Sequence, residues 1–415
     1  MSNNQVIIVG GGAAGFFAAI NCAANYPQIQ VTLLEAGRKP LAKVRISGGG
    51  RCNVTHHCFD TPLLIQNYPR GGKALRGAFF RFQPQDTVAW FKQRGVKLKT
   101  EADGRMFPVT NSSETIINCL TTSAVQAEVK LLTNSGVKTV KKQPPGFKLG
   151  LKDGRELNCD RLLLATGSNR DGYGWARDLG HNIIPPVPSL FTFKIKDPRL
   201  QGLAGTSVAE VSARLQAPGL TPQTGPLLVT HWGVSGPAIL KLSAWGARVL
   251  SDHNYQMGLT INWLPQFNQE SLRQELLIVK SQVPKRKIIN NCPFDLPKRL
   301  WQRLVIAAGI KEDKPWAELS KKGLNQLVQE LNLGQYEIKG KGTFKEEFVT
   351  CGGVDLKEVD FKTMGSKLCP GLHFAGEILD IDGVTGGFNF QSAWTTGWLA
   401  GKALGCKRKG GTHQK

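Results

Sequence analysis

The chain has 415 residues, of which 53 are lysine or arginine and 31 are aspartate or glutamate, so its formal net charge is +22. Hydrophobic residues make up 41% and charged residues 20%, a composition that excludes a disordered or collagen-like chain and predicts two or three globular domains. No apolar run is long enough to span a membrane, and the first residues are polar and not a signal peptide, so we expect a cytoplasmic protein. Nine widely spaced cysteines favour reduced thiols.

An apolar strand at 5–9 runs into a glycine-rich loop and then into a helix expected over 16–25. The loop has the pattern G-x-G-x-x-G at Gly10, Gly12 and Gly15, which is typical of a dinucleotide-binding turn with the pyrophosphate at the helix N-terminus. A second strand at 31–34 ends in Glu35, whose carboxylate we expect to accept hydrogen bonds from ribose hydroxyls. This part of the chain alone does not distinguish NAD from FAD.

The C-terminal part favours FAD. A strand near 371–375 leads to a glycine and an acid, and a glycine-rich turn leads into a helix expected over 392–404. An acid after a strand can hold a polyol, and a helix N-terminus can stabilise negative charge on a flavin ring. Between the two ends, an apolar strand closes with Ala165-Thr-Gly167, where the chain is expected to pass the cofactor. A nucleotide domain built from both chain ends implies an insertion.

The insertion is expected between about 188 and 340. The prolines at 185, 186 and 188 predict a stiff exit from the first domain, because consecutive prolines continue neither a helix nor a central strand. Within the insertion we expect four strands, one helix and then three further helices in a small subdomain. The strands are at 190–196, 208–215, 227–230 and 255–264, the single helix is at 236–250, and the three helices are at 268–282, 297–308 and 314–331.

The positive charge is concentrated in three stretches. Residues 36–85 have nine basic residues and one acid, residues 270–345 have fifteen and eight, and residues 402–415 have five and none. A polyanionic partner such as RNA explains this distribution, because each neutralised phosphate releases a counterion. A generally basic surface with a solvated tail explains it as well.

Several motifs resemble those of the BaiN/RdsA-type FAD-dependent oxidoreductases. They are VRISGGGRCN at 44–53, VTHWGVSGP at 229–237, VTCGGV at 349–354, and the segments 363–380 and 386–391. The resemblance implies an α/β fold in which a Rossmann-like FAD-binding domain (1–187 and 343–415) is interrupted by a β-barrel-like insertion (188–267 and 333–342) with a helical subdomain (268–332). It also implies one of two activities: reduction of conjugated C=C bonds in bile-acid intermediates, or reduction of a uridine in large-subunit ribosomal RNA to dihydrouridine.

The resemblance assigns residues to the cofactor. For the ADP half of FAD these are Gly10, Gly12, Ala14, Gly15 and Glu35, with Val129 touching adenine through its backbone. For the pyrophosphate, ribityl chain and ring they are Lys43, Gly50, Arg51, Cys52, Asn53, Gly167, Gly376, Glu377, Gly387 and Asn389. The chain departs from many relatives at 168–174, where a longer glycine- and serine-rich stretch is shortened.

Both activities deliver hydride from reduced flavin to one carbon of an electron-poor double bond, while an acid protonates the other. Candidate acids are Cys52 and His231, with Cys351 weaker. The alternatives are that Cys52 is a packed thiol and that His231 holds a loop. NAD(P)H is the expected electron donor, and because the chain has one dinucleotide motif it would dock transiently.

No metal is expected, because the cysteines and histidines at 52–58 lack the spacing of a zinc site. The segment 68–82 alternates aromatic residues with Arg70, Lys73, Arg76 and Arg81, a pattern that suits RNA phosphates and bases. Alternatively, its phenylalanines face the core. Three hypotheses remain: a ribosomal RNA uridine reductase, a small-molecule enoyl reductase, and a non-catalytic RNA-binding protein that keeps FAD.

Overall fold

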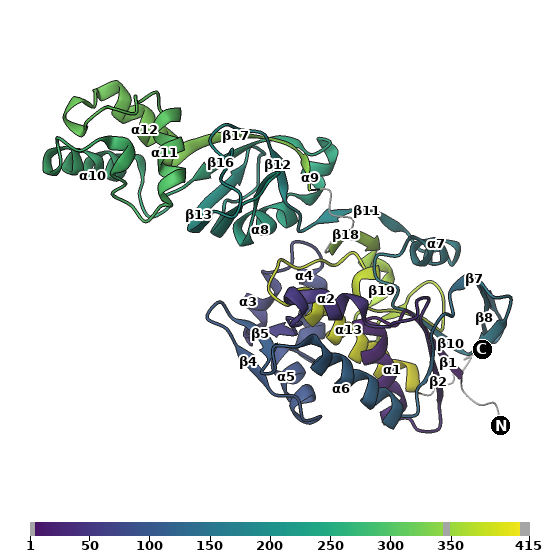
Figure 1. The fold of residues 1–415 in the computed structure, drawn as a ribbon. Helices are drawn as coiled ribbons and strands as arrows, with labels where there is room; N and C mark the ends of the chain where they lie inside the picture. Colours follow the sequence, from purple (N-terminus) through teal and green to yellow (C-terminus); the bar gives the residue numbers. More distant parts are fainter. Residues whose placement is uncertain (1–4, 343–348, 407–415) are drawn as a thin grey trace. The chain divides into compact units, whose positions relative to one another are not determined.

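A computed structural model describes residues 5–342 and 349–406 (Figure 1). Contacts divide them into one unit formed by 5–186 and 349–406 and a second formed by 187–342. The part of the predicted basic tail beyond 406 lies outside the described residues. The predicted domain boundary at 342/343 lies at their limit, because residues 343–348 are not described. None of the described helices is long and apolar enough to cross a membrane.

The first unit is built on a seven-stranded sheet with the order β19-β20-β21-β10-β1-β2-β6. Its strands are β1 (Gln5–Val9), β2 (Gln30–Leu34), β6 (Lys130–Leu132), β10 (Arg161–Leu164), β19 (Val359–Asp360), β20 (Gly365–Ser366) and β21 (Leu372–Phe374). β1 runs parallel to both β10 and β2, and β21 runs parallel to β10. Parallel strands bring the loops at their carboxyl ends to one edge, so the glycine loop, Glu35, Gly167 and Glu377 share that edge.

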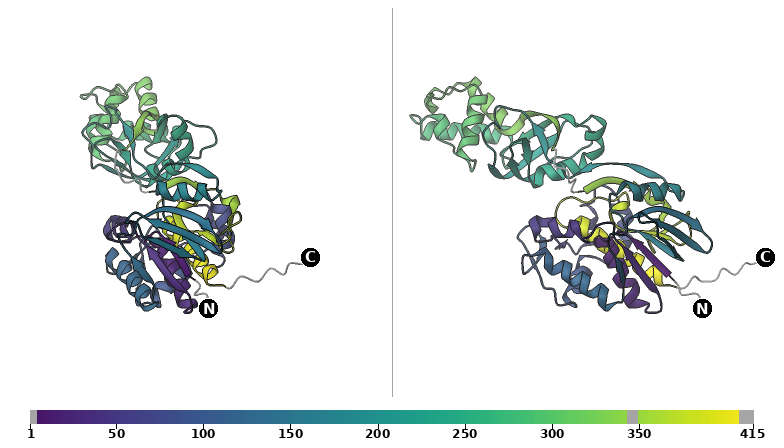
Figure 2. Two further views of the ribbon diagram at one scale, coloured as in Figure 1. Left: turned by 90° about the vertical axis from the view of Figure 1, so that its right-hand side faces the viewer. Right: turned by 45° about the vertical axis from the view of Figure 1, so that its right-hand side comes forward.

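Helices from the two chain ends pack directly against each other beside this sheet. The helices are α1 (Ala13–Asn25), α2 (Ala42–Gly50), α3 (Thr61–Ile65), α4 (Gly72–Phe79), α5 (Pro84–Lys92), α6 (Ser113–Gln126), α7 (Arg170–Asp178) and α13 (Phe388–Gly405). A Cβ on Gly397 or Gly401 of α13 would lie 2.7 Å from Ala14 O or 2.6 Å from Ala18 O of α1. Both views in Figure 2 show the yellow C-terminal helix beside the purple N-terminal elements. Helix α13 begins at residue 388, four residues earlier than the predicted start at 392.

Three small sheets complete this part of the chain. They are β3 (Thr55–His56), β5 (Arg105–Pro108) and β4 (Leu98–Thr100); β7 (Val137–Gln143), β8 (Gly146–Leu151) and β9 (Glu156–Cys159); and β11 (Ile183–Ser189) with β18 (Val349–Val354). The prolines expected to break regular structure lie inside β11. They are tolerated because β11 has a single neighbouring strand, so one side of its backbone needs no ladder partner.

The second unit contains a closed six-stranded barrel with the order β12-β15-β14-β13-β16-β17. Its strands are β12 (Phe193–Ile195), β13 (Ser207–Leu215), β14 (Gln223–Val229), β15 (Gly233–Ser235), β16 (Gln256–Asn262) and β17 (Gly334–Lys341). The helix expected over 236–250 is two helices, α8 (Pro237–Trp245) and α9 (Ala247–Asp252). Gly246 ends the first and begins the second, and a Cβ there would lie 2.5 Å from Leu215 Cδ1.

A helical subdomain is inserted between β16 and β17. It contains α10 (Gln269–Gln282), η1 (Ile288–Asn290), α11 (Lys298–Ala307), η2 (Trp316–Glu318) and α12 (Lys321–Leu333). The last helix begins at 321 and not at 314, because the Ser320 side chain caps it by accepting a hydrogen bond from Gly323 N at 3.1 Å. Buried Trp301 donates to Ile288 O at 2.8 Å and so ties α11 to η1. A Rossmann-like unit interrupted by a barrel with helices confirms the predicted fold class.

Candidate functional site

The loop between β1 and α1 leaves room for a ligand at Gly12. A Cβ at Gly10 would lie 2.3 Å from Ala165 O, and one at Gly15 would lie 1.9 Å from Gly10 O, so these two glycines permit close packing. Gly12 caps α1, and none of the described residues outside its chain neighbours comes within 4 Å of the place of its Cβ. An open position at a helix N-terminus suits a pyrophosphate, because backbone N–H groups face it.

The Glu35 carboxylate lies against the same loop. Its Oε2 accepts a hydrogen bond from Gly11 N at 2.9 Å, and its Oε1 accepts one from Gly37 N at 2.7 Å. The acid is therefore held at the end of β2, where a ribose is expected. Val129 directly precedes β6, and its N–H donates to Ala124 O at 2.9 Å, so this N–H is not available for the predicted backbone contact with adenine.

Lys43 and Glu377 join the two chain ends. Lys43 Nζ lies 2.5 Å from Glu377 Oε2, and Glu377 Oε1 accepts a hydrogen bond from Thr350 N at 2.9 Å. A Cβ at Gly167 would lie 3.6 Å from the same carboxylate, and one at Gly376 would lie 2.9 Å from Ala14 Cβ. Predicted cofactor residues from four segments of the chain are thus neighbours.

The C-terminal part of α2 leaves the helical conformation and forms a turn that exposes peptide groups. Gly48, Gly49 and Gly50 have φ values of +56°, +69° and +83°, in the left-handed region that favours glycine. Within the described residues, nothing except chain neighbours comes within 4 Å of a Cβ placed at Gly49 or Gly50. Successive peptide groups in such a turn form a cradle that a dinucleotide can fill.

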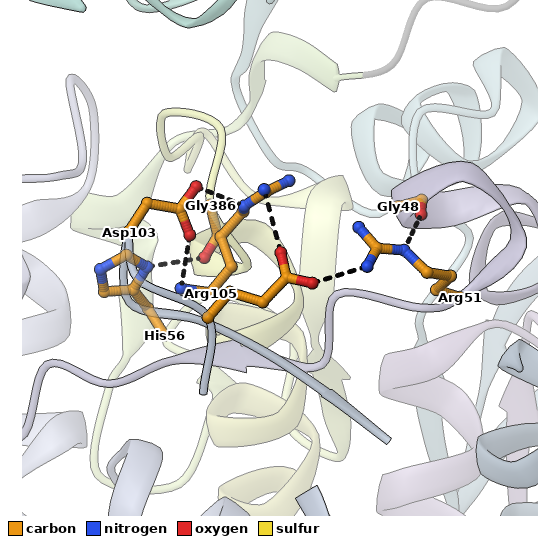
Figure 3. Close-up of polar contacts among 7 residues, drawn as sticks. Gly48, Arg51, His56, Asp103, Arg105 and Gly386 are labelled. Carbon is orange, nitrogen blue, oxygen red and sulfur yellow. Dashed lines mark hydrogen bonds and ion pairs between the residues drawn. The ribbon is translucent and has the colours of Figure 1, made fainter. Parts of the chain in front are cut away.

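Polar side chains next to this turn are engaged with the protein. Arg51 Nη1 donates to Glu101 Oε1 at 2.6 Å, and Arg105 Nη2 donates to the same carboxylate at 3.1 Å. Both arginines are labelled in Figure 3. The guanidinium of Arg51 also lies 4.0 Å from the centre of the Phe107 ring. The side chain of Arg51 therefore fixes the turn, and a contact between this segment and the cofactor stays a prediction.

Two asparagines predicted to contact the cofactor have side chains that hold the loop before α13, and their contact with the cofactor stays a prediction. The Asn53 side-chain amide donates a hydrogen bond to Thr55 O at 3.1 Å and accepts one from Gly387 N at 3.0 Å. Asn389 exchanges two hydrogen bonds of 2.8 Å with the backbone of Gly383. His56 Nδ1 lies 3.0 Å from Gly386 O (Figure 3), so this loop is fixed from several sides.

Two buried hydroxyls at the same edge have no hydrogen-bond partner among the described residues. They are Thr166 Oγ1, which follows β10, and the hydroxyl of Tyr173 on α7. Burial and the nearby carboxylates of Glu377 and Asp380 raise the pKa of Tyr173, so it holds its proton as a donor. Unpaired buried polar atoms are rare and mark a place for a missing partner. The sequence prediction omitted both residues, although the Ala-Thr-Gly motif was a signal for the first.

These observations together test whether FAD fits. The open cradle at Gly12, Gly49 and Gly50 provides backbone donors, Glu35 provides an acceptor, and Thr166 and Tyr173 provide hydroxyls that lack partners in the described part of the chain. A dinucleotide with phosphates, ribose hydroxyls and a polyol chain has the complementary groups. The residues present therefore fit FAD.

The two predicted proton donors lie in different units. Cys52 is fully buried with φ +60°, and burial raises the pKa of its thiol to about 12, which is poorly matched to proton donation near neutral pH. His231 is exposed and lies between β14 and β15 of the barrel. Its participation stays a prediction.

The predicted cationic segment is only partly available to a ligand. Arg70 binds the fully buried carboxylate of Asp382 through two nitrogens, with Nε 2.5 Å from Oδ1, so it is a structural cation and not a phosphate ligand. Lys73, Arg76 and Arg81 are exposed on and after α4, although Arg81 also donates to Lys362 O at 2.9 Å. Phe79 and Phe82 are buried, whereas the side chain of Phe80 is 68% exposed.

The chain matches the family described as HI0933-like protein Rossmann domain over residues 4–403. It is similar to the ribosomal RNA dihydrouridine synthase of Escherichia coli, with 31% identity over 97% of this chain and 98% of that protein. It is also similar to the 3-dehydro-bile acid delta(4,6)-reductase of Clostridium scindens, with 29% identity over 96% of this chain and 98% of that protein. The solved 3-ketosteroid-delta4-(5alpha)-dehydrogenase of Rhodococcus jostii shares the fold, with a TM-score of 0.51 and 15% identity over 98% of both chains.

Proposed function

The chain belongs to the HI0933-like Rossmann family and is an FAD-dependent oxidoreductase, and on this premise we propose that it reduces uridine to dihydrouridine in large-subunit ribosomal RNA. The observation that carries the proposal is a pair of full-length relatives named ribosomal RNA dihydrouridine synthase, joined to a net charge of +22 in this chain. A polyanionic substrate such as RNA would account for that charge, because basic side chains bind phosphates. We expect the reaction to take place in the cytoplasm.

FAD, when bound and reduced, supplies a hydride for one carbon of an electron-poor double bond. The chain then has to hold the substrate, exclude water and give a proton to the other carbon. We assign the proton to His231 in preference to Cys52, because imidazole is well suited to proton transfer near neutral pH and the buried thiol is not. The exposed cations Lys73, Arg76 and Arg81 would hold phosphates, and Phe80 beside them offers a ring for base stacking.

NAD(P)H is the proposed source of electrons. The sequence has one G-x-G-x-x-G loop between a strand and a helix, so the nicotinamide donor would dock only for the time of hydride transfer. Bleaching of the bound flavin absorbance by NADH or NADPH without RNA would support this assignment. Failure of both nucleotides would favour another donor or a non-catalytic RNA-binding protein.

A second candidate is a small-molecule enoyl reductase. The observation in its favour is the bile-acid reductase relative, which matches nearly as large a share of this chain. Such a reaction would need the same hydride and proton transfers but no phosphate contacts. The two candidates therefore differ in their dependence on Lys73, Arg76 and Arg81.

The deciding experiment measures dihydrouridine in large-subunit ribosomal RNA by nucleoside mass spectrometry, from cells with and without this gene. The proposal expects loss of one dihydrouridine, restored by the wild-type gene but not by Gly12→Asp, whose carboxylate would occupy the open cradle. A matched pair, His231→Gln and His253→Gln, then tests the acid, since both histidines are exposed in the same unit. Unchanged dihydrouridine would contradict the proposal and direct a screen toward conjugated carbonyl acceptors.

A further inference from the structure

The helical subdomain has a polar groove that no step of the proposed reaction uses. The groove has a volume of about 520 Å³, and its lining includes Lys287 and Asn290 from η1 and its N-terminal flank, and Arg299, Gln302 and Arg303 from α11. The groove is a built feature of the second unit. Arg299 Nη2 donates to Gly202 O at 2.6 Å, which ties α11 to the barrel, and Trp301 ties α11 to η1.

The side of the groove formed by η1 and α11 is strongly basic. From Lys280 to Arg303 the chain has seven basic residues and one acid, Asp295. Six of these cations, 285–287, 298, 299 and 303, are exposed, and none of the six has an ion-pair partner in the described part of the chain. Glu312 and Asp313 line the groove as well, so phosphate contacts would be restricted to the η1 and α11 side.

The cations continue outside the groove, which indicates a ligand larger than a small anion. Lys287, Arg299 and Arg303 line it, whereas the equally exposed cations at 285, 286 and 298 do not. One bound phosphate would use the first set and leave the second without a role. A chain of phosphates can use both, and the amides of Asn290 and Gln302 can donate to and accept from base edges.

The helical subdomain that carries the groove is inserted at one end of β17, and the chain leaves the second unit from the other end. Phe193 at the start of β12 pairs with Lys341 at the end of β17, whereas the helical subdomain joins β17 at Gly334. The eight residues of β17 span about 26 Å at the usual rise of a strand.

We propose that this groove is an RNA docking site, which binds the phosphate backbone of structured ribosomal RNA. The inference rests on the proposed function and deepens it by giving the RNA a second anchor in the other unit. A small-molecule acceptor has no use for such a surface.

The test compares two doubly neutralised variants of the full-length, FAD-loaded protein. Lys287→Gln with Arg303→Gln removes two groove cations and spares Arg299, which holds α11 to the barrel. Lys321→Gln with Lys322→Gln removes two exposed cations from α12 of the same subdomain, outside the groove lining. Binding to protein-free large-subunit ribosomal RNA, purified from cells lacking the gene, is measured at several salt concentrations. Flavin content and thermal unfolding report on folding.

We expect the groove variant to bind about tenfold more weakly and its slope of log affinity against log salt to fall by about 2, because each lost phosphate contact removes about one unit. The α12 variant should stay within about twofold of wild type. Wild-type binding by the groove variant, or equal losses in both variants, would overturn the docking site. Failure of the proposed function is separate: it appears as absent dihydrouridine with wild-type protein, whereas failure of the docking site alone leaves wild-type dihydrouridine formation intact.

Discussion

Basic side chains have different roles in two regions of the molecule. Around the glycine loops of the first unit, Lys43, Arg51 and Arg70 bind acids that are 334, 50 and 312 residues away in the sequence. Around η1 and α11 of the second unit, the exposed cations have no ion pair within the described residues. Net charge therefore overstates the positive charge that a polyanion can reach. Cations that already form an ion pair with an acid within the protein are not available to a polyanion.

The largest expected effect comes from the Arg70 ion pair. Arg70→Ala removes the cation from a buried carboxylate and should lower the free energy of unfolding by about 3–5 kcal/mol. Lys73→Ala, three residues along and exposed, should change it by less than about 0.5 kcal/mol. Urea denaturation of the FAD-free protein measures both. Equal, small effects would show that Arg70 is as available to ligands as Lys73.

The glycine loop allows packing and ligand binding to be separated. Gly15→Ala places a methyl group against Gly10 O and should cost about 2–3 kcal/mol of stability. Gly12→Ala meets only open space, so we expect unchanged unfolding of the FAD-free protein and FAD affinity reduced more than about tenfold. Calorimetry of the apoprotein and flavin fluorescence titration measure the two effects. Tight FAD binding by Gly12→Ala would contradict the cradle.

The buried thiol of Cys52 should make the protein less stable at high pH. Burial raises the pKa of Cys52 from 9.0 to about 12, so between these values the unfolded chain releases a proton that the folded chain retains. Stability is fully present below pH 9 and falls by about 1.4 kcal/mol per pH unit above it from this group. Cys52→Ala should make the decline shallower by that amount, measured as unfolding free energy between pH 9 and 11. An unchanged slope would place the thiol in contact with solvent.

Tyr173→Phe tests an unpaired hydroxyl and has the smallest expected effect. Removing it should leave the apoprotein as stable or about 1 kcal/mol more stable, while FAD affinity falls about fivefold. Tyr68→Phe is the matched control, because its hydroxyl donates to Phe388 O at 2.7 Å and its loss should destabilise the protein. Thermal unfolding of the two FAD-free variants measures these opposite changes in stability. A destabilised Tyr173→Phe apoprotein would mean that the hydroxyl has a partner within the protein.

Local patterns predicted the fold well. Strand β1, the glycine loop, helix α1 and Glu35 are close in sequence, and together they are compatible with few structures other than a dinucleotide-binding turn. The site was less predictable, because it depends on pairs that only the tertiary structure creates. Nothing near Arg70 in the sequence indicates that Asp382 will bind it. Helix limits failed for a similar reason: Gly246 looks compatible with one helix until Leu215 packs against it.

The pairing of α1 with α13 has a consequence for synthesis of the protein. The cofactor unit needs residues from both ends of the chain, so a growing polypeptide lacks its last helix until about residue 405 has left the ribosome. The barrel unit is encoded in one continuous stretch ending at 342 and can fold earlier. During translation the buried face of α1 therefore remains without its partner helix until the end of synthesis.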